Sequence, residues 1–164
     1  MIDQELKAAA ARVLDLCRQR RLKIATAESC TGGLVAAALT EISGSSDVVE
    51  CGFVTYSNEA KRDLLGVPAA VLAAHGAVSR ETAAAMAQGA RAKSGADLAV
   101  AITGIAGPDG GSAEKPVGLV HFAVARQGKV IPHEHRFGDV GRHEVRRRSV
   151  LVVLDLLADL VEGE

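Results

Sequence analysis

Aromatic side chains are scarce in this 164-residue sequence, which contains three Phe, one Tyr and no Trp. Single-stranded nucleic acids are commonly bound by stacking their bases on aromatic side chains. An excess charge of one sign is also lacking, because 19 Lys and Arg residues stand against 20 Asp and Glu residues, a formal net charge of −1. A near-neutral chain has no general attraction for polyanions. We therefore expect no nucleic-acid partner.

Cysteine is scarce too, and long apolar runs are missing. Cys17, Cys30 and Cys51 are odd in number and form no C-x-x-C pair, which favours reduced thiols. No stretch of 18 apolar residues is free of charge, so we expect no membrane partner. Residues 1–5 show neither the basic nor the apolar part of a secretory signal. The predicted location is the cytoplasm.

The residues that are present predict one α/β domain over residues 1–164, with no linker and no internal repeat. Amphipathic spacing predicts helices over 3–19, 31–41, 59–65, 79–94 and 142–161. Asn58 and Ser79 are the predicted N-caps of the third and fourth of these helices. Apolar and β-branched runs predict strands over 22–27, 48–57, 97–103, 117–126 and 129–137. This order favours a three-layer α/β/α domain with a mixed sheet, partly antiparallel at the final hairpin.

Ser29 is the first candidate for chemistry, because Glu28-Ser29-Cys30-Thr31 and a glycine pair join a predicted strand to a predicted helix. Such turns in α/β proteins present hydroxyl groups and backbone N–H groups to ligands. Ser29 is therefore interpreted either as a nucleophile or as a plain helix cap. Cys30 is a rival nucleophile, but the sequence offers it no basic partner.

A serine nucleophile requires a base, and Lys61 is a better candidate than any of the five His residues. It lies after the second predicted strand, in the first turn of a helix, where burial would lower the pKa of its amine. The alternative is a surface lysine paired with Glu59 or Asp63. His133 and His135 share one strand face but lack the third ligand that a metal site needs, so no metal is predicted.

A glycine-rich segment, residues 103–111, follows the third predicted strand. Gly104 and Gly107 would allow backbone N–H groups to approach an oxyanion or a phosphate. The segment contains neither a G-x-x-x-x-G-K-[ST] phosphate loop nor a G-x-G-x-x-G dinucleotide motif. The alternative interpretation is a flexible approach to the hairpin.

Three motifs in this order resemble the C-terminal domain of the competence/damage-inducible protein CinA, a family of nicotinamide mononucleotide amidases. The motifs are residues 26–33, residues 54–61, and residues 103–108 together with 115–118. The resemblance covers essentially the whole chain. It implies hydrolysis of the carboxamide of nicotinamide mononucleotide by a Ser/Lys dyad, without a cofactor.

By this resemblance, Ser29 is the nucleophile and Lys61 the general base, while Tyr56 assists the dyad and Thr103 holds the amide or the oxyanion. The substrate-binding residues implied by the loops and by the resemblance are Cys30, Thr31, Gly32, Gly33, Gly104, Gly107 and Arg142. The same turns also fit a non-catalytic nucleotide-binding protein, or an accessory protein in competence or DNA repair. The alanine-rich stretch 79–94 suits packing either on the sheet or on another subunit, which leaves a homo-oligomer open.

Overall fold

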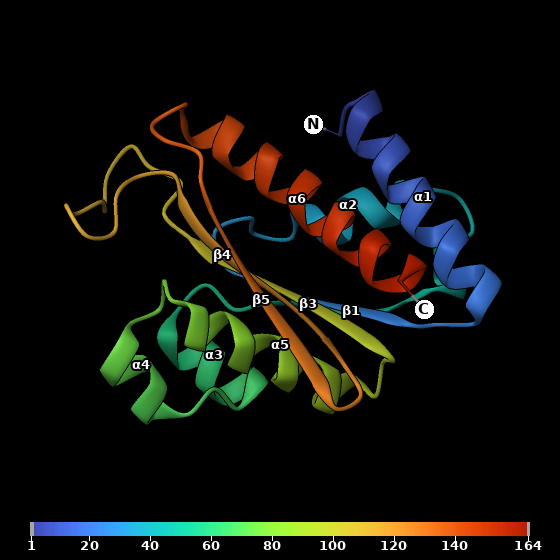
Figure 1. The fold of residues 1–164 in the computed structure, drawn as a ribbon, viewed down its shortest axis with the longest axis horizontal. Coiled ribbons are helices and arrows are strands. Elements are labelled where there is room, and N and C mark those ends of the chain that lie inside the picture. Colours follow the sequence, from blue (N-terminus) through green and yellow to red (C-terminus); the bar gives the residue numbers. More distant parts are fainter. Residues whose placement is uncertain (1, 164) are drawn as a thin grey trace.

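A five-stranded mixed sheet runs through the centre of the protein in the computed structural model, which describes residues 2–163 (Figure 1). The strand order is β2-β1-β3-β4-β5, and β1 pairs in parallel with both β2 and β3. β4 pairs antiparallel with β3 and with β5. The predicted mixed sheet with a C-terminal hairpin is confirmed. The strands are β1 (Ile24–Glu28), β2 (Val49–Val54), β3 (Leu98–Gly104), β4 (Leu119–Arg126) and β5 (Lys129–Arg136).

Helices cover both faces of the sheet and complete the predicted three layers (Figure 1). One face carries α1 (Gln4–Arg20), α2 (Leu34–Thr40) and α6 (Arg142–Glu162). The other face carries α3 (Asn58–Leu65), α4 (Ala69–His75) and α5 (Arg80–Ser94). A short 3-10 turn, Ser45–Asp47, precedes β2.

The alternation of side chains along the strands assigns each layer its own core. In β1, Ile24 belongs to the core beneath α1, α2 and α6, whereas Ala25 and Ala27 face α5. The α5 face is made largely of alanine, on the strands and on the helix alike, so the helix backbone packs close to the sheet. Ala83, Ala87 and Ala90 of α5 are buried there, which accounts for much of its alanine-rich pattern.

Two details of the α3–α4 region differ from the prediction. The N-cap of α3 is Ser57 and not Asn58, because the Ser57 hydroxyl accepts a hydrogen bond from the backbone N–H of Ala60 at 3.0 Å. The helix α4 was not predicted, since it is short, has no side-chain cap and buries none of its residues. The other predicted cap is confirmed, because the Ser79 hydroxyl accepts from the backbone N–H of Thr82 at 3.1 Å.

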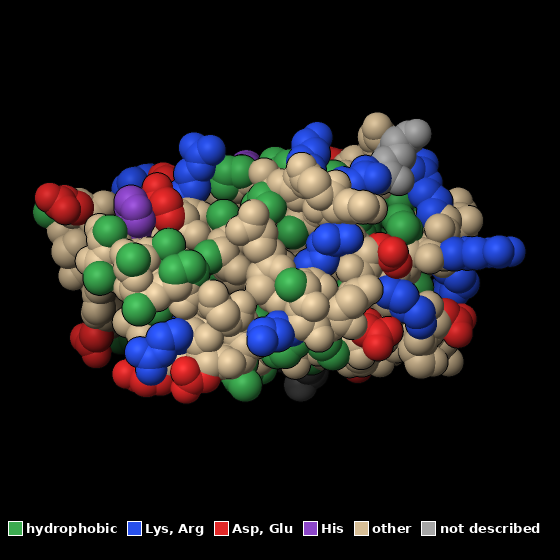
Figure 2. Space-filling model, turned by 90° about the horizontal axis from the view of Figure 1, so that it is seen from below, with side chains coloured by type: hydrophobic (Ala, Val, Ile, Leu, Met, Phe, Trp, Pro, Cys, Tyr) green, Lys and Arg blue, Asp and Glu red, His purple; other side chains and the backbone are tan. Residues whose placement is uncertain are grey.

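The face formed by α3, α4 and α5 mixes side chains of both charges, and its hydrophobic side chains gather at the end where α4 lies (Figure 2). Leu64, near the C-terminus of α3, is among the exposed large hydrophobic residues. Within residues 2–163, none of the helices combines the length and the apolar character that a membrane crossing requires.

Candidate active site

The carboxyl ends of the parallel strands β1, β2 and β3 meet at one edge of the sheet, and the predicted dyad lies there. Ser29 directly follows β1, and Lys61 lies in the first half of α3, which follows β2. Thr103 lies at the end of β3. Ligand sites of open α/β sheets form at this edge, because the loops diverge around it. A cavity of about 280 Å³ at this edge is lined by Ser29, Cys30, Tyr56, Lys61, Ala77, Val78, Thr103, Gly104, Ile105, Ala106, Gly107, Asp109, Gly110 and Arg142.

The Lys61 side chain is brought to the Ser29 hydroxyl, as predicted. Lys61 Nζ lies 3.1 Å from Ser29 Oγ and donates to the carbonyl oxygen of Thr55 at 2.9 Å. A longer contact of 3.5 Å reaches the carbonyl oxygen of Tyr56. The side chain of a helical residue points back toward the helix N-terminus, and this direction brings Lys61 from α3 to the sheet edge.

Lys61 is buried and is not the surface lysine of the alternative interpretation. It is only 1% exposed, and the structure pairs it with no carboxylate among residues 2–163. Asp63 is paired with Arg62 instead. Burial lowers the pKa of the Lys61 amine below its ordinary value of 10.5, because the charged form loses its hydration. The neutral amine, which is the form that acts as a base, is thereby favoured.

The thiol of Cys30 is a poor nucleophile in this structure. Cys30 lines the cavity but is buried, and burial raises the pKa of its thiol to about 12. A thiol acts as a nucleophile through its thiolate, which such a pKa suppresses near neutral pH. Ser29, which is in contact with an amine, is therefore the better candidate nucleophile of the two.

The structure does not bring Thr31, Gly32 and Gly33 into the cavity, although these residues were predicted to bind the substrate. The backbone N–H of Gly32 donates to the Ser29 carbonyl at 3.0 Å, and that of Leu34 donates to the Thr31 carbonyl at 3.1 Å. The Gly32 N–H thus stabilises the turn itself and is not available to a ligand. Substrate binding by Thr31, Gly32 and Gly33 stays a prediction, and none of the three lines the cavity.

The carboxylate of Glu28, the last residue of β1, lies at the start of α2, and the sequence predicted no role for it. Its Oε1 accepts from the backbone N–H of Val35 at 2.8 Å, and its Oε2 accepts from that of Ala36 at 3.1 Å. The first turn of a helix leaves such N–H groups without intrahelical partners. The sequence contains one indication of this contact. Glu28 directly precedes Ser29, and the glycine pair before α2 has no side chain that could cap the helix.

The loop after β3 requires its two glycines for steric reasons. A Cβ at Gly104 would lie 2.8 Å from Val120 Cγ2, and one at Gly107 would lie 2.7 Å from Val117 Cγ1. Gly107 also has a φ of +83°, which favours glycine. The backbone N–H groups of Ala106 and Gly107 have no acceptor among residues 2–163, so they are available to a ligand in the cavity that these two residues line.

Thr103 lines the cavity but uses its hydroxyl to tie two elements together. Its Oγ1 donates to the carbonyl oxygen of Ala77 at 2.8 Å, which joins the end of β3 to the segment before α5. A hydroxyl oxygen that donates one hydrogen bond still has lone pairs with which it can accept another. Ala77 and Val78 line the cavity as well, and no feature of the sequence indicated them.

Arg142 and Tyr56 meet at the cavity, although 86 residues separate them. Arg142 Nη2 donates to the Tyr56 hydroxyl at 3.0 Å, and Nη1 donates to the Gly107 carbonyl at 2.9 Å. The Tyr56 side chain, 61% exposed, thus contacts Arg142, while only its backbone carbonyl faces Lys61. The predicted assistance of the dyad by Tyr56 therefore has no direct contact between the Tyr56 hydroxyl and Lys61 behind it.

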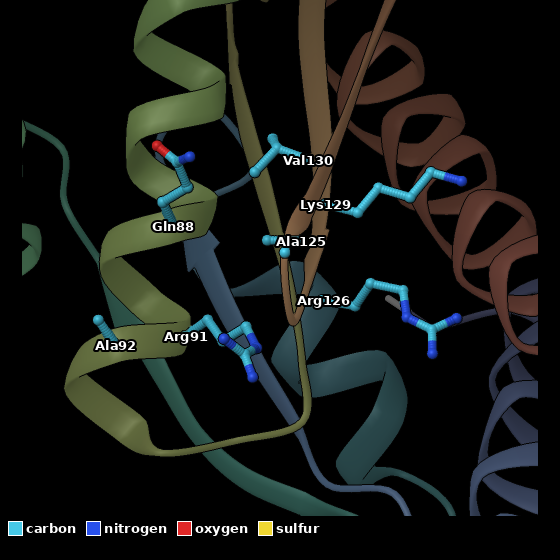
Figure 3. Close-up of a pocket in the computed structure, with 8 residues that line it drawn as sticks. Gln88, Arg91, Ala92, Ala125, Arg126, Lys129 and Val130 are labelled. Carbon is cyan, nitrogen blue, oxygen red and sulfur yellow. The ribbon is translucent and has the colours of Figure 1, made fainter.

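Two other features lack the chemistry of this site. A cavity of about 340 Å³ lies between α5 and the β4–β5 turn, where Arg126 and Lys129 extend away from α5 toward α6 (Figure 3). It is at the opposite end of the sheet from Ser29. In the hairpin, the ring of His135 packs on Phe137 at a centroid distance of 4.3 Å. Across residues 2–163, no group of three or more His, Cys, Asp or Glu side chains is arranged to hold a metal ion.

Comparison with known proteins supplies the family. The profile of the CinA C-terminal domain matches residues 6–161. The chain belongs to the CinA C-terminal domain family. A CinA-like protein of Geobacter sulfurreducens is 50% identical over 155 residues, which are 94% of this chain and 37% of that protein. A CinA-like protein of Synechococcus sp. is 54% identical over 146 residues, 88% of this chain and 35% of that protein.

Solved CinA structures share the complete fold. The competence/damage-inducible protein CihA of Agrobacterium tumefaciens is 55% identical with a TM-score of 0.95, and the alignment covers 98% of each chain. A CinA superfamily protein of Escherichia coli is 33% identical with a TM-score of 0.91, covering 98% of this chain and 93% of that one. This CinA domain therefore matches whole solved chains, whereas it spans about a third of the length of the curated CinA-like relatives.

Proposed function

We propose that this CinA domain is an amidohydrolase that converts nicotinamide mononucleotide into nicotinate mononucleotide and ammonia. The observation that supports it best is the buried Lys61 amine, 3.1 Å from the Ser29 hydroxyl at the rim of a cavity. A serine becomes a nucleophile when a neighbouring base removes its proton, and a desolvated lysine is such a base. The choice of substrate follows the resemblance to nicotinamide mononucleotide amidases.

The contacts of Lys61 orient its lone pair in this mechanism. A neutral amine has two N–H groups and one lone pair. The carbonyl oxygens of Thr55 and Tyr56 are positioned to accept hydrogen bonds from the two N–H groups. The lone pair then faces the Ser29 hydroxyl and accepts its proton as the alkoxide attacks the carboxamide carbon. The resulting Lys61 ammonium returns the proton to the departing amine, which leaves as ammonia.

The tetrahedral intermediate requires hydrogen-bond donors for its oxyanion. The backbone N–H groups of Ala106 and Gly107 supply them, because both residues line the cavity and these N–H groups have no acceptor within residues 2–163. A water molecule, deprotonated by Lys61, then hydrolyses the acyl-Ser29 ester and releases the nicotinate product. Serine, lysine and water complete the reaction, so the proposed steps use no cofactor.

Product analysis tests the proposal directly. We expect the purified protein, incubated with nicotinamide mononucleotide, to release equal amounts of ammonia and nicotinate mononucleotide, measured by a coupled ammonia assay and by mass spectrometry. Binding of the mononucleotide without turnover would contradict the amidase and favour a nucleotide-binding protein. Release of ammonia only from other carboxamides would keep the dyad and replace the substrate.

The pH dependence of kcat/KM reports the pKa of the proposed base, Lys61. Burial lowers the pKa of Lys61 below 10.5, so the active, neutral amine forms at a lower pH than in an exposed lysine. We expect kcat/KM to rise with pH through a single ionisation below 10.5 and then to level off. A profile that rises only with a pKa at or above 10.5 would show that the base is not desolvated.

Substitution of Arg142 tests substrate binding. Its guanidinium lies at the cavity beside Tyr56 and is suited to a phosphate, for which charge-assisted hydrogen bonds contribute about 1.5–3 kcal/mol. We expect Arg142→Ala to lower kcat/KM by about 10- to 100-fold, mainly through a higher KM. Arg148→Ala is the matched control, because Arg148 lies on the same helix but is paired with Glu144. An unchanged KM in Arg142→Ala would exclude the phosphate contact.

A further inference from the structure

The carboxylate of Glu28 holds the turn that carries the nucleophile. Glu28 is the last residue of β1, is 1% exposed, and directly precedes Ser29. Side chains alternate along a strand, so Ile24, Thr26 and Glu28 point to the α2 face while the next side chain points to the α3 face. Neighbouring residues thus reach two different layers: Glu28 contacts α2, and Ser29 contacts Lys61 of α3.

Glu28 contacts α2 through both oxygens of its carboxylate. The two carboxylate oxygens accept from consecutive backbone N–H groups, at 2.8 Å from Val35 and 3.1 Å from Ala36. The N-cap residue of α2 is Gly33, which has no side chain and a φ of +100°. A cap that normally comes from the helix's own first residue therefore comes from the preceding strand.

This contact closes the segment between Glu28 and α2 into a ring. Within the ring, the Gly32 N–H donates to the Ser29 carbonyl, and the Leu34 N–H donates to the Thr31 carbonyl. Outside it, the Ser29 N–H donates to Ile102 of β3 at 3.0 Å, and the Glu28 carbonyl accepts from Thr55 at 2.9 Å. The peptide group between Glu28 and Ser29 is thus bonded to β3 and to the residue that follows β2, and the Glu28 carboxylate joins the far end of the turn to α2.

We propose that Glu28 is a positioning residue of the dyad. The hydrogen bonds of its carboxylate to the first turn of α2 set the distance between Ser29 Oγ and Lys61 Nζ. This inference rests on the proposed Ser/Lys dyad. Glu28 does not line the cavity, so it acts on the rate through the turn and not on substrate binding. Because proton transfer requires hydrogen-bond contact, a displacement of about 1 Å costs about 100-fold in rate.

The test compares Glu28→Gln and Glu28→Asp with the unmodified protein. The glutamine amide retains one acceptor oxygen but turns an NH₂ group toward the N–H of Ala36, and the aspartate withdraws both oxygens by one methylene. We expect each variant to lower kcat for nicotinamide mononucleotide by about 10- to 100-fold, with KM changed by less than about threefold. The control is Ala38→Gly, which weakens the buried interior of α2 without touching the turn. It should lower the melting temperature and keep kcat.

A second measurement separates this inference from the proposed substrate. The rate at which a fluorophosphonate modifies Ser29, followed by mass spectrometry, reports nucleophile activation without nicotinamide mononucleotide. We expect the modification rate to fall in both Glu28 variants in parallel with kcat. If the fluorophosphonate reacted with the protein without substitutions but that protein did not turn over the mononucleotide, only the substrate assignment would be wrong. The Glu28 variants would still test the role of Glu28. Unchanged modification rates in folded variants, or no modification in any protein, would overturn the inference.

Discussion

Ser29→Ala is expected to abolish the release of ammonia from nicotinamide mononucleotide, with a fall in kcat of at least about 10⁴-fold. Removal of a serine nucleophile leaves only what the oxyanion donors and substrate binding contribute, because no covalent intermediate forms. Removal of one hydroxyl at a turn that is held by backbone hydrogen bonds has little effect on folding. The measurements are the initial rate of ammonia release and the melting temperature.

Ser43→Ala is the matched control for this substitution. Ser43 is exposed and lies beyond the C-terminus of α2, away from the cavity. It should keep the full rate of ammonia release. If Ser29→Ala retained the rate of the unmodified protein, Ser29 would not be the nucleophile. If it were inactive but bound the mononucleotide with unchanged affinity, the loss would lie in the chemical step, as expected.

Lys61→Met is expected to cause a comparable loss of activity, because no other amine contacts the Ser29 hydroxyl within residues 2–163. Methionine has a similar length and no charge, so it removes the cost of burying an amine. It also leaves the Thr55 carbonyl without its donor, at about 1–3 kcal/mol. We therefore expect the free energy of unfolding at pH 7 to change by less than about 2 kcal/mol, measured by urea denaturation, while kcat falls by at least about 10⁴-fold.

Stability as a function of pH gives Lys61→Met a signature of its own. In the unmodified protein the folded pKa of Lys61 is lower than the unfolded value of 10.5, so between these two values the unfolded chain binds more protons than the folded one. The free energy of unfolding contributed by Lys61 therefore rises with pH across that interval and is lowest below the folded pKa. Lys61→Met should lack this rise, whereas the exposed-lysine control Lys93→Met should retain it. An unchanged pH dependence in Lys61→Met would show that Lys61 is not desolvated.

The pattern of the sequence was sufficient to predict the three layers and the positions of both residues of the proposed dyad. Ser29 and Lys61 each follow a strand pattern, and parallel strands bring such positions to one edge. The helix α6 shows the limit of this reasoning. Periodicity predicts that its core-facing residues are Val145, Ser149, Val152, Val153, Leu156 and Leu160. Val145, Ser149 and Val153 are buried as predicted, whereas Val152, Leu156 and Leu160 are only partly buried. The other buried residues are Val150, Leu154, Leu157, Ala158 and Val161. Most positions of that helix are apolar, so spacing alone does not choose the buried ones.

Long-range contacts could not be predicted from the sequence, for a different reason. Arg142 reaches Gly107 and Tyr56 only because the start of α6 lies over the loop that follows β3. The carboxylate of Glu28 reaches α2 because two glycines with positive φ turn the chain back toward the strand. Neither contact has a local pattern, since each depends on where a distant backbone segment passes.

The sequence by itself determined the fold class, the family and the residue types of the proposed dyad, because periodicity and motif order are local properties of the chain. Only the tertiary structure decided that Lys61 is buried beside the Ser29 hydroxyl, that Cys30 is buried with a raised thiol pKa, and that Thr31, Gly32 and Gly33 do not line the cavity. The physical reason is that burial, and with it the pKa of an amine or a thiol, is set by the segments that surround a side chain. Those segments come together only when the layers pack.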